Sequence, residues 1–284
     1  LATIKGHSFA LTLLDGLWAL QVLSGIEALA PELGLRPILP SAEPREVALV
    51  HPIVEELKGI GAVNDDGEVD PAIVEWLTVL ARRDVGLLIY VTTPSDPNTV
   101  GVLLARFAQW WVVIERAEDI VRIGPAGTAT AEGAANAVVK SQIERLLGPS
   151  VPVVMRPATI DATHIVSRVK SGEGLGGFLS EQRLDQDQIR TLMLATDTSR
   201  SASASIVAVQ SGVDGAANRV HIEHGSVTIY DTPDGRVLIE HSPQGEKNWM
   251  IASPGTAGNI ATAINAMVRR LPAKDEWFSY RRIV

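Results

Sequence analysis

Apolar residues recur at helical spacing along the first 80 positions of the chain. Between positions 14 and 29 this spacing predicts a buried amphipathic helix, with a short strand expected before it at 9–13. A second helical pattern covers 45–60. Asp70 and Pro71 predict the start of a third helix, because Asp is a favoured N-cap and Pro is favoured at the first helical position.

From position 85 the pattern changes to apolar and β-branched runs separated by turns, which predicts strands. They are expected at 85–93, 100–107, 109–116 and 119–123, with 124–128 ending the sheet and a closing helix at 129–147. The second part of the chain repeats this order. Helices are expected at 160–170 and 178–196, strands at 203–210, 219–223, 226–230, 236–241 and 248–252, and a closing helix up to Leu271.

The repetition extends to short stretches of sequence. Positions 113–116 match 238–241 at an offset of 125, and Gly-Thr-Ala at 127–129 matches Gly-Thr-Ala at 255–257 at an offset of 128. Self-similarity at a nearly fixed offset indicates duplication. Two related halves, residues 1–150 and 151–284, are therefore expected to form one body with pseudo-twofold symmetry. Strands joined by tight turns favour an antiparallel sheet in an α+β fold.

The composition excludes several kinds of site. The chain has 284 residues and no Cys, which rules out a disulfide, a thiolate zinc site, an Fe–S cluster and a cysteine nucleophile. Its 25 Lys and Arg stand against 33 Asp and Glu, a formal net charge of −8. This balance disfavours nucleic acid as a partner, and 46% hydrophobic residues disfavour wholesale disorder.

The apolar stretch 8–30 imitates a secretion signal, because it ends in Ala28-Leu29-Ala30. Asp15 and Gln21 interrupt it and Glu27 lies beside the apparent cleavage point, so a buried helix is the favoured interpretation. No other stretch approaches the roughly 18 consecutive apolar residues of a membrane span. A cytoplasmic protein without membrane insertion is therefore expected.

A glycine-rich segment is the most specific candidate for chemistry. Residues 172–177 match the G-x-G-x-x-G pattern of dinucleotide-binding proteins, and Asp197 follows 20 positions later. The pattern requires a buried parallel strand before it, whereas the preceding residues are better interpreted as a helix end. A loop between helices is therefore favoured, and a nucleotide-dependent enzyme remains an alternative.

The other candidate groups have structural interpretations. Thr128 and Thr256 each precede a predicted helix and are expected to be N-caps, not parts of an anion site. His221 and His224 flank Glu223 in a predicted strand, where a spacing of three places them on opposite sides and disfavours a shared metal. Since no catalytic, cofactor or metal site is convincing, we expect a protein that works through a surface. The duplicated strands also leave a self-associating scaffold open.

Several short motifs, in order, resemble a known family. They are Leu17-Trp18-Ala19-Leu20-Gln21, Leu35-Arg36-Pro37, Val69-Asp70-Pro71 with Glu75-Trp76-Leu77, the stretch 203–209, Ser253-Pro254-Gly255-Thr256, and Leu271-Pro272 with Glu276-Trp277. Together they resemble the EspG family, the secretion-associated proteins of mycobacterial type VII (ESX) systems, over nearly the whole chain. The short loop at 94–99 resembles the paralogue of the third ESX system.

The resemblance implies a fold and a function. The implied fold is a central antiparallel sheet with flanking helical bundles in a quasi-twofold arrangement. The implied function is that of a cytosolic, non-enzymatic chaperone that binds PE–PPE heterodimers at the hydrophobic helical tip of the PPE subunit and keeps them soluble. Such a chaperone is expected to be a monomer or a weak homodimer, with the loop at 92–100 at the rim of its site. The implied partner-binding residues are Gly174, Leu175, Gly177, Phe178, Leu179, Leu192, Met193, Ser203, Ser205 and Val207.

Overall fold

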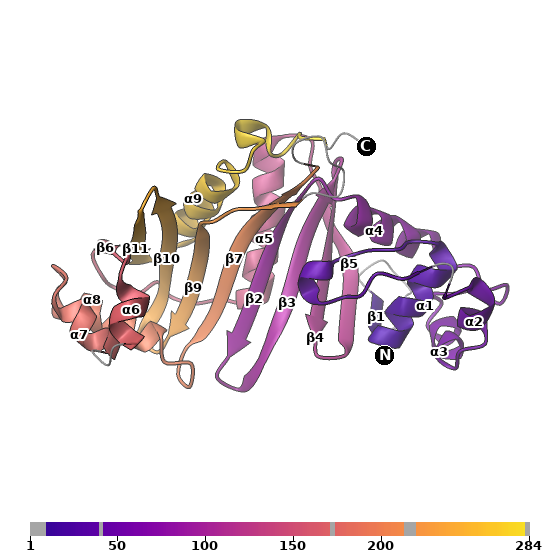
Figure 1. Cartoon of the computed structure of the whole chain (residues 1–284), viewed down its shortest axis with the longest axis horizontal. Coiled ribbons are helices and arrows are strands. Elements are labelled where there is room, and N and C mark those ends of the chain that lie inside the picture. The colour runs from indigo at the N-terminus through magenta and orange to yellow at the C-terminus, as the bar shows by residue number, and fades with distance from the viewer. Residues whose placement is uncertain (1–9, 40–41, 171–173, 213–219, 282–284) are drawn as a thin grey trace.

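In the described part of the chain, eleven strands form one antiparallel sheet that runs along the molecule (Figure 1). The structure is a computed structural model that describes residues 10–39, 42–170, 174–212 and 220–281. The strands are β1 (Ala10–Leu13), β2 (Val85–Thr93), β3 (Asp96–Phe107), β4 (Trp110–Ala117), β5 (Ile120–Thr128), β6 (Ala158–Asp161), β7 (Ala202–Ser211), β8 (Val220–Ile222), β9 (Ser226–Thr232), β10 (Gly235–Gln244) and β11 (Lys247–Pro254). Their order is β1-β5-β4-β3-β2-β7-β9-β10-β11-β6, with β8 paired to β7.

The two halves of the sheet have the same order when they are followed outward from its centre. From β2 the neighbours are β3, β4, β5 and β1, and from β7 they are β9, β10, β11 and β6. Val113 of β4 and Leu238 of β10, which the repeat had matched, therefore occupy corresponding strands. The predicted antiparallel α+β fold with two related halves is confirmed. The β2–β7 pairing joins them into one sheet, and the boundary at residue 150 stays a prediction.

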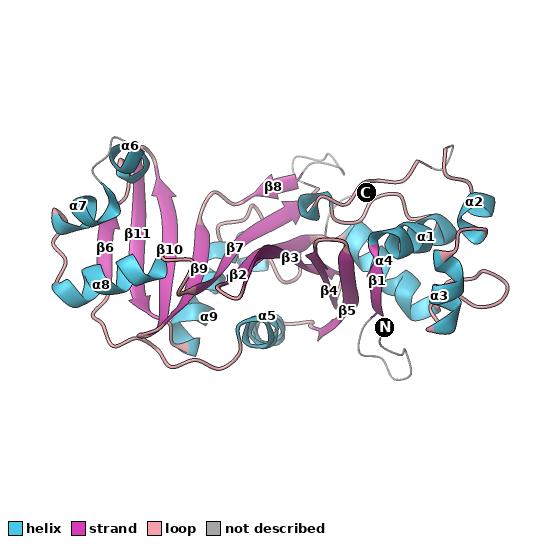
Figure 2. Ribbon diagram, turned by 90° about the horizontal axis from the view of Figure 1, so that it is seen from below, coloured by secondary structure: helices cyan, strands magenta, loops and turns pink. Residues whose placement is uncertain are grey.

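Helices cover the two faces of the sheet in different places (Figure 2). They are α1 (Leu14–Ser24), α2 (Arg45–Leu49), α3 (Ile53–Gly59), α4 (Pro71–Arg82), α5 (Glu132–Leu147), α6 (Ile165–Lys170), α7 (Gly174–Ser180), α8 (Gln186–Ala195) and α9 (Ala257–Val268), with 3-10 turns η1 (Pro31–Leu33) and η3 (Lys274–Glu276). Alternate side chains of β2 separate the layers. Leu87 joins the core beneath α5 and α9, while Leu88 joins the core beneath α1–α4. The helices α7 and α8 lie on the same face as α1–α4, but at the other end of the sheet, over β6, β10 and β11.

The first predicted helices are shorter than expected. The pattern at 45–60 is two helices, because Pro52 has no N–H to continue the ladder and α3 starts immediately after it. The helix expected up to 29 ends at Ser24, where Gly25 adopts a φ of 71° and its N–H bonds to the carbonyl of Gln21. It is also buried around most of its circumference rather than amphipathic.

In the middle of the chain, other helices and strands begin or end at residues that differ from the expected ones. The strand expected to end at 123 continues as β5 to Thr128, and β6 occupies the start of the helix expected at 160–170. The pattern at 178–196 is divided between α7 and α8, because Asp185 and Gln188 form a capping box that starts a new helix. These boundaries were missed because strand pairing at a sheet edge and helix capping involve only a few residues. Hydrophobic periodicity is recognised over a longer window and does not locate them.

The two threonines expected to be N-caps differ in the structure. Thr256 caps α9, since its Oγ1 accepts a hydrogen bond of 3.1 Å from the Asn259 N–H. Thr128 is instead the last residue of β5, and α5 starts after Ala131 without a side-chain cap. The prediction was therefore correct for Thr256 and wrong for Thr128.

This difference gives a matched pair of substitutions. We expect Thr256→Ala to lower the free energy of unfolding by about 1 kcal/mol, because one orphan N–H of α9 loses its acceptor. Thr128→Ala should change it by less than about 0.5 kcal/mol. Urea unfolding followed by circular dichroism measures both values, and equal losses in the two variants would contradict the capping assignment.

A buried charged pair connects the C-terminal segment to the sheet. The guanidinium of Arg106 is fully buried, and it donates to the carbonyls of Phe278 at 2.8 Å and Tyr280 at 2.6 Å. The carboxylate of Asp84, also buried, lies 3.7 Å away. Burial lowers the pKa of Arg106 to about 10, and the opposing charge of Asp84 limits the decrease. Arg106 is therefore still a cation at neutral pH.

Candidate functional site

One part of the sheet lies between the two groups of helices on the same face. Along β2, β7 and β9 the side chains of Tyr90, Thr92, Ser203, Ser205, Val207 and Thr228 remain partly or largely accessible, and we call this set the open strip. Tyr90 is the most accessible of them, at 38%. Figure 1 shows α1–α4 at one end of the sheet and α6–α8 at the other.

The register of the strands places these side chains in rows. Ser205 lies opposite Tyr90 on β2 and opposite Thr228 on β9, while Ser203 lies opposite Thr92. Directly opposed residues project from the same face of an antiparallel sheet. The hydroxyl oxygens of Thr92 and Ser203 are 2.8 Å apart, as are those of Ser205 and Thr228. Apart from Tyr90 and Val207, the strip is therefore lined by small hydroxyl side chains, over which the backbone of a partner could approach closely.

The predicted partner-binding residues on α7 and α8 divide into two sets. Gly174, Leu175 and Gly177 of α7 are half-buried, and Met193 of α8 is 41% exposed. A Cβ built on Gly176 would lie 3.9 Å from the Met193 sulfur, so α7 and α8 meet at this point. These residues lie on the same face of the sheet as the open strip.

Phe178, Leu179 and Leu192 lie on the buried side of the same two helices. All three side chains are buried in a core cluster with Ile239 and Met250 of the sheet. They fix α7 and α8 to β10 and β11 instead of presenting an apolar surface. Their burial gives them a supporting role beneath α7 and α8, and a part of theirs in the binding surface stays a prediction. Periodicity alone could not make this distinction, because a helix buries and exposes apolar residues at the same spacing.

The described part of the glycine-rich segment, 174–177, is helical and not the loop that was expected. Residues 171–173 lie outside the described residues, and Gly174 to Ser180 form the helix α7. The helix α6, not a parallel strand, precedes the segment. Asp197 accepts from the Ser199 N–H at 3.1 Å in a local turn. Among the residues that the structure describes here, the strand-to-helix context that a dinucleotide fingerprint requires is therefore missing.

The first half of the chain borders the open strip on its other side. The Tyr90 hydroxyl donates to the carbonyl of Glu32 in η1 at 3.2 Å, which connects the strip to the first helical group. The segment 92–100, expected as a rim loop, is mostly the β2–β3 hairpin with its turn at 94–95. Tyr90 and Thr228 were not identified from the sequence, and only the register between β2, β7 and β9 could have indicated them.

The remaining candidate groups are a pair of histidines and a cleft on the other face of the sheet. The rings of His221 and His224 are 6.3 Å apart in an edge-to-face contact, so they were wrongly expected on opposite sides, since β8 ends at Ile222. Across the described residues no cluster of three metal-ligating side chains occurs.

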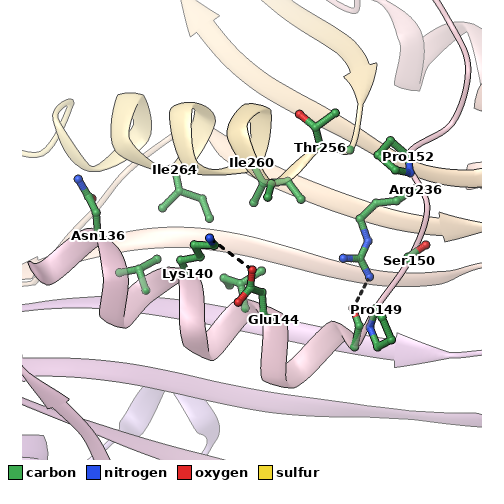
Figure 3. Close-up of a pocket in the computed structure, with 16 residues that line it drawn as sticks. Asn136, Lys140, Glu144, Pro149, Ser150, Pro152, Arg236, Thr256, Ile260 and Ile264 are labelled. Carbon is green, nitrogen blue, oxygen red and sulfur yellow. Dashed lines mark hydrogen bonds and ion pairs between the residues drawn. The ribbon is translucent and has the colours of Figure 1, made fainter. Parts of the chain in front are cut away.

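A cleft between α5 and α9 (Figure 3) lies on the opposite face of the sheet from the open strip. In the described part of the chain no helix is both long and apolar enough to cross a bilayer.

Comparisons with known proteins identify similar chains. The model of the EspG family matches residues 14–266. The chain is 44% identical to the ESX-2 secretion-associated protein EspG2 of Mycobacterium tuberculosis H37Rv, over 96% of this chain and 99% of that protein. It is 28% identical to the ESX-3 secretion-associated protein EspG3 of Mycolicibacterium smegmatis, over 78% of this chain and 73% of that protein. The higher identity to the ESX-2 protein disagrees with the ESX-3 paralogue that the short loop had indicated.

A solved structure has the same fold. It is that of the Mycobacterium tuberculosis type VII secretion system chaperone EspG5 in complex with a PE25–PPE41 dimer. The match has a TM-score of 0.74 and covers 94% of this chain and 98% of that chain, at 20% sequence identity. The two chains therefore share a fold.

Proposed function

Because this chain belongs to the EspG family, we propose that it is a non-enzymatic secretion chaperone that binds a PE–PPE heterodimer through the open strip. The observation that carries the proposal is this accessible, hydroxyl-lined part of the sheet between two groups of helices. The related EspG5 has been solved with a PE25–PPE41 dimer. The partner proposed here is of the same class.

The proposed binding mode follows from the chemistry of the strip. A helical tip of a PPE protein would expose apolar side chains, and such a patch promotes aggregation. Covering it removes apolar surface from water, at about 25 cal/mol per Å². The small side chains of Ser203 and Ser205 allow close approach, while their hydroxyls can bond polar atoms around the tip. Val207, Leu175 and Met193 would supply apolar contacts at the edges of the strip.

Cellular context and release complete the proposal. We expect the complex to form in the cytoplasm, before the PE–PPE pair reaches the secretion machinery. Release by competition at that machinery needs no nucleotide chemistry in the chaperone, and none of the described residues forms a metal-ligating cluster. The edge strands β1 and β6 have only four residues each, which limits edge-to-edge pairing and favours a monomer or weak homodimer.

Co-expression tests the proposed function directly. Co-expression with candidate PE–PPE pairs is expected to yield one soluble complex containing each of the three chains once. Size-exclusion chromatography with light scattering would measure its mass, with the chaperone alone and the pair alone as controls. A pair that stays soluble alone and never co-elutes with the chaperone would contradict the proposal.

The two alternatives predict different results. A nucleotide-dependent enzyme would show a thermal shift with NAD, NADP, ATP or GTP that Gly174→Asp abolishes. A self-associating scaffold would show a mass that rises with concentration when no partner is present. For the proposed chaperone we expect no nucleotide shift and no such increase over the micromolar range.

A further inference from the structure

A cleft of about 330 Å³ lies between α5 and α9, on the face of the sheet opposite the open strip. Its size falls at the lower end of the range of ligand sites, roughly 300–1,000 Å³. Ile143 on α5 and Ile260 and Ile264 on α9 line its apolar part, while Lys140 and Glu144 form an ion pair of 3.7 Å at its mouth (Figure 3).

The two helices meet at one end and diverge at the other. Near the start of α5 the Asn265 side chain donates to Asn136 at 3.2 Å, and Arg269 pairs with Glu132 at 2.7 Å. Towards the end of α5 the cleft opens against the connecting segment after Gly148. The antiparallel helices therefore have two ends that the pseudo-twofold symmetry relates to each other, one closed and one open.

The closed end holds a tryptophan. Trp277 is 1% exposed, and its ring contacts that of Trp111 edge to face, with 6.4 Å between centroids. Ala129, Met267 and Leu271 belong to the same buried cluster. The segment that supplies Trp277 follows α9 directly and is held by Arg106 through backbone carbonyls.

The cleft corresponds, in the other half of the chain, to the buried site that holds Trp277. Arg236 follows Trp111 by 125 positions, the same offset that relates the two halves. Trp111 lies opposite Gly127 in the β4–β5 ladder, and the Arg236 carbonyl accepts from the Gly255 N–H at 2.8 Å in the corresponding place. The segment after α5, 148–157, contains no aromatic residue, whereas the segment after α9 carries Trp277, Phe278 and Tyr280. The same kind of site is therefore present in the second half, but no aromatic side chain among the described residues fills it.

The wall of the cleft suits an aromatic ring. Arg236 is 7% exposed, and Asp231 holds its guanidinium at 2.6 Å and 2.7 Å through two nitrogens. One of these nitrogens also donates to the Gly148 carbonyl at 3.1 Å. These bonds hold the guanidinium in one plane, and aromatic rings stack favourably on such a plane. Figure 3 shows Arg236 at one end of the cleft and Ile260 and Ile264 along its side.

We propose that the cleft between α5 and α9 binds an aromatic side chain presented by a partner polypeptide, in the way that the closed end holds Trp277. The partner would insert a tryptophan-like ring between Ile143 and Ile260, with one face or edge against Arg236. This binding is separate from the open strip and does not depend on the proposed function.

Methyl NMR of the full chain with N-acetyl-tryptophanamide as the probe tests the proposal. Ring currents from a bound indole should shift the δ1-methyl signals of Ile143, Ile260 and Ile264, and leave Ile73 in the distant N-terminal core unchanged. N-acetyl-leucinamide, which has the same backbone groups, should bind at least about fivefold more weakly. Equal affinity for the two probes, or equal shifts at Ile73, would overturn the proposal.

Two substitutions on the same helix provide a matched control. Ala261 lines the cleft and Ala266 does not, although both are exposed on α9. Ala261→Trp should fill the cleft and weaken binding of N-acetyl-tryptophanamide at least about tenfold, whereas Ala266→Trp should stay within about twofold of the unsubstituted protein. Unchanged binding in a folded Ala261→Trp variant would overturn the proposal. Ser150→Trp, on the connecting segment at the rim, provides a second blocking variant if Ala261→Trp does not fold.

Discussion

Ser205→Arg is expected to weaken binding of a PE–PPE pair at least about 100-fold, a loss of roughly 3 kcal/mol in binding free energy. Ser205 occupies the middle of the open strip, opposite Tyr90 and Thr228. A long cationic side chain there would prevent close approach of a helical tip and would have to be desolvated against apolar groups. Isothermal titration with the purified pair, or bio-layer interferometry if the pair needs a solubility tag, measures the affinity.

A control substitution separates the surface from general effects on the strand. Thr159 is an exposed strand residue on β6, at the far edge of the sheet. Thr159→Arg should leave the affinity within about twofold. If Ser205→Arg retains its fold and binds the pair as tightly as Thr159→Arg, the open strip is not the binding surface. The family function could still hold in that case, because co-elution with the pair tests it independently.

Asp84→Leu is expected to lower the free energy of unfolding by about 3–5 kcal/mol, because it leaves the cation of Arg106 buried without its counter-charge. Both side chains are essentially inaccessible to water, and Asp84 also accepts from the Ala108 N–H at 3.2 Å. Arg106 in turn holds the segment that carries Trp277. Urea unfolding should therefore show a lower midpoint together with earlier exposure of Trp277.

The matched control is an exposed ion pair. Lys140 and Glu144 lie 3.7 Å apart with more than half of each side chain exposed, so Glu144→Gln should cost less than about 0.5 kcal/mol. The double variant Asp84→Leu with Arg106→Leu should be less destabilised than the sum of the two single variants, since it removes the charge left without a partner. Additive losses would contradict the assignment of a coupled buried pair.

The strand-rich parts of the fold could be predicted well because their signals are local. The run 85–93 is the strand β2, residue for residue, and Asp70 caps α4 through a hydrogen bond of 2.8 Å to the Ala72 N–H, with Pro71 at its first position. β-branched runs and caps depend on neighbouring residues, so the sequence is sufficient to locate them. The repeat was also visible, because corresponding strands retained Glu115 and Glu240 at matching positions.

The candidate site was only partly predictable. Ser203, Ser205 and Val207 were expected on the surface from the family resemblance, and they do lie on the accessible strip. Phe178 and Leu192 were expected there as well but are buried, because α7 and α8 pack on β10 and β11. Whether an apolar helix residue faces a partner or the core depends on the element above or below it, and spacing carries no information on that choice.

The sequence by itself determined the class of the fold, its two related halves, the succession of most strands along the chain and, through several short motifs that follow one another in order, the family. Only the tertiary structure decided the open strip and the aromatic-free cleft. Tyr90, Ser205 and Thr228 are 23 or more positions apart along the chain and meet only through strand register. The cleft arises because two equivalent helix ends are closed by different segments, one with Trp277 and one without an aromatic residue. Both features depend on contacts between distant parts of the chain, which local propensity and periodicity do not encode.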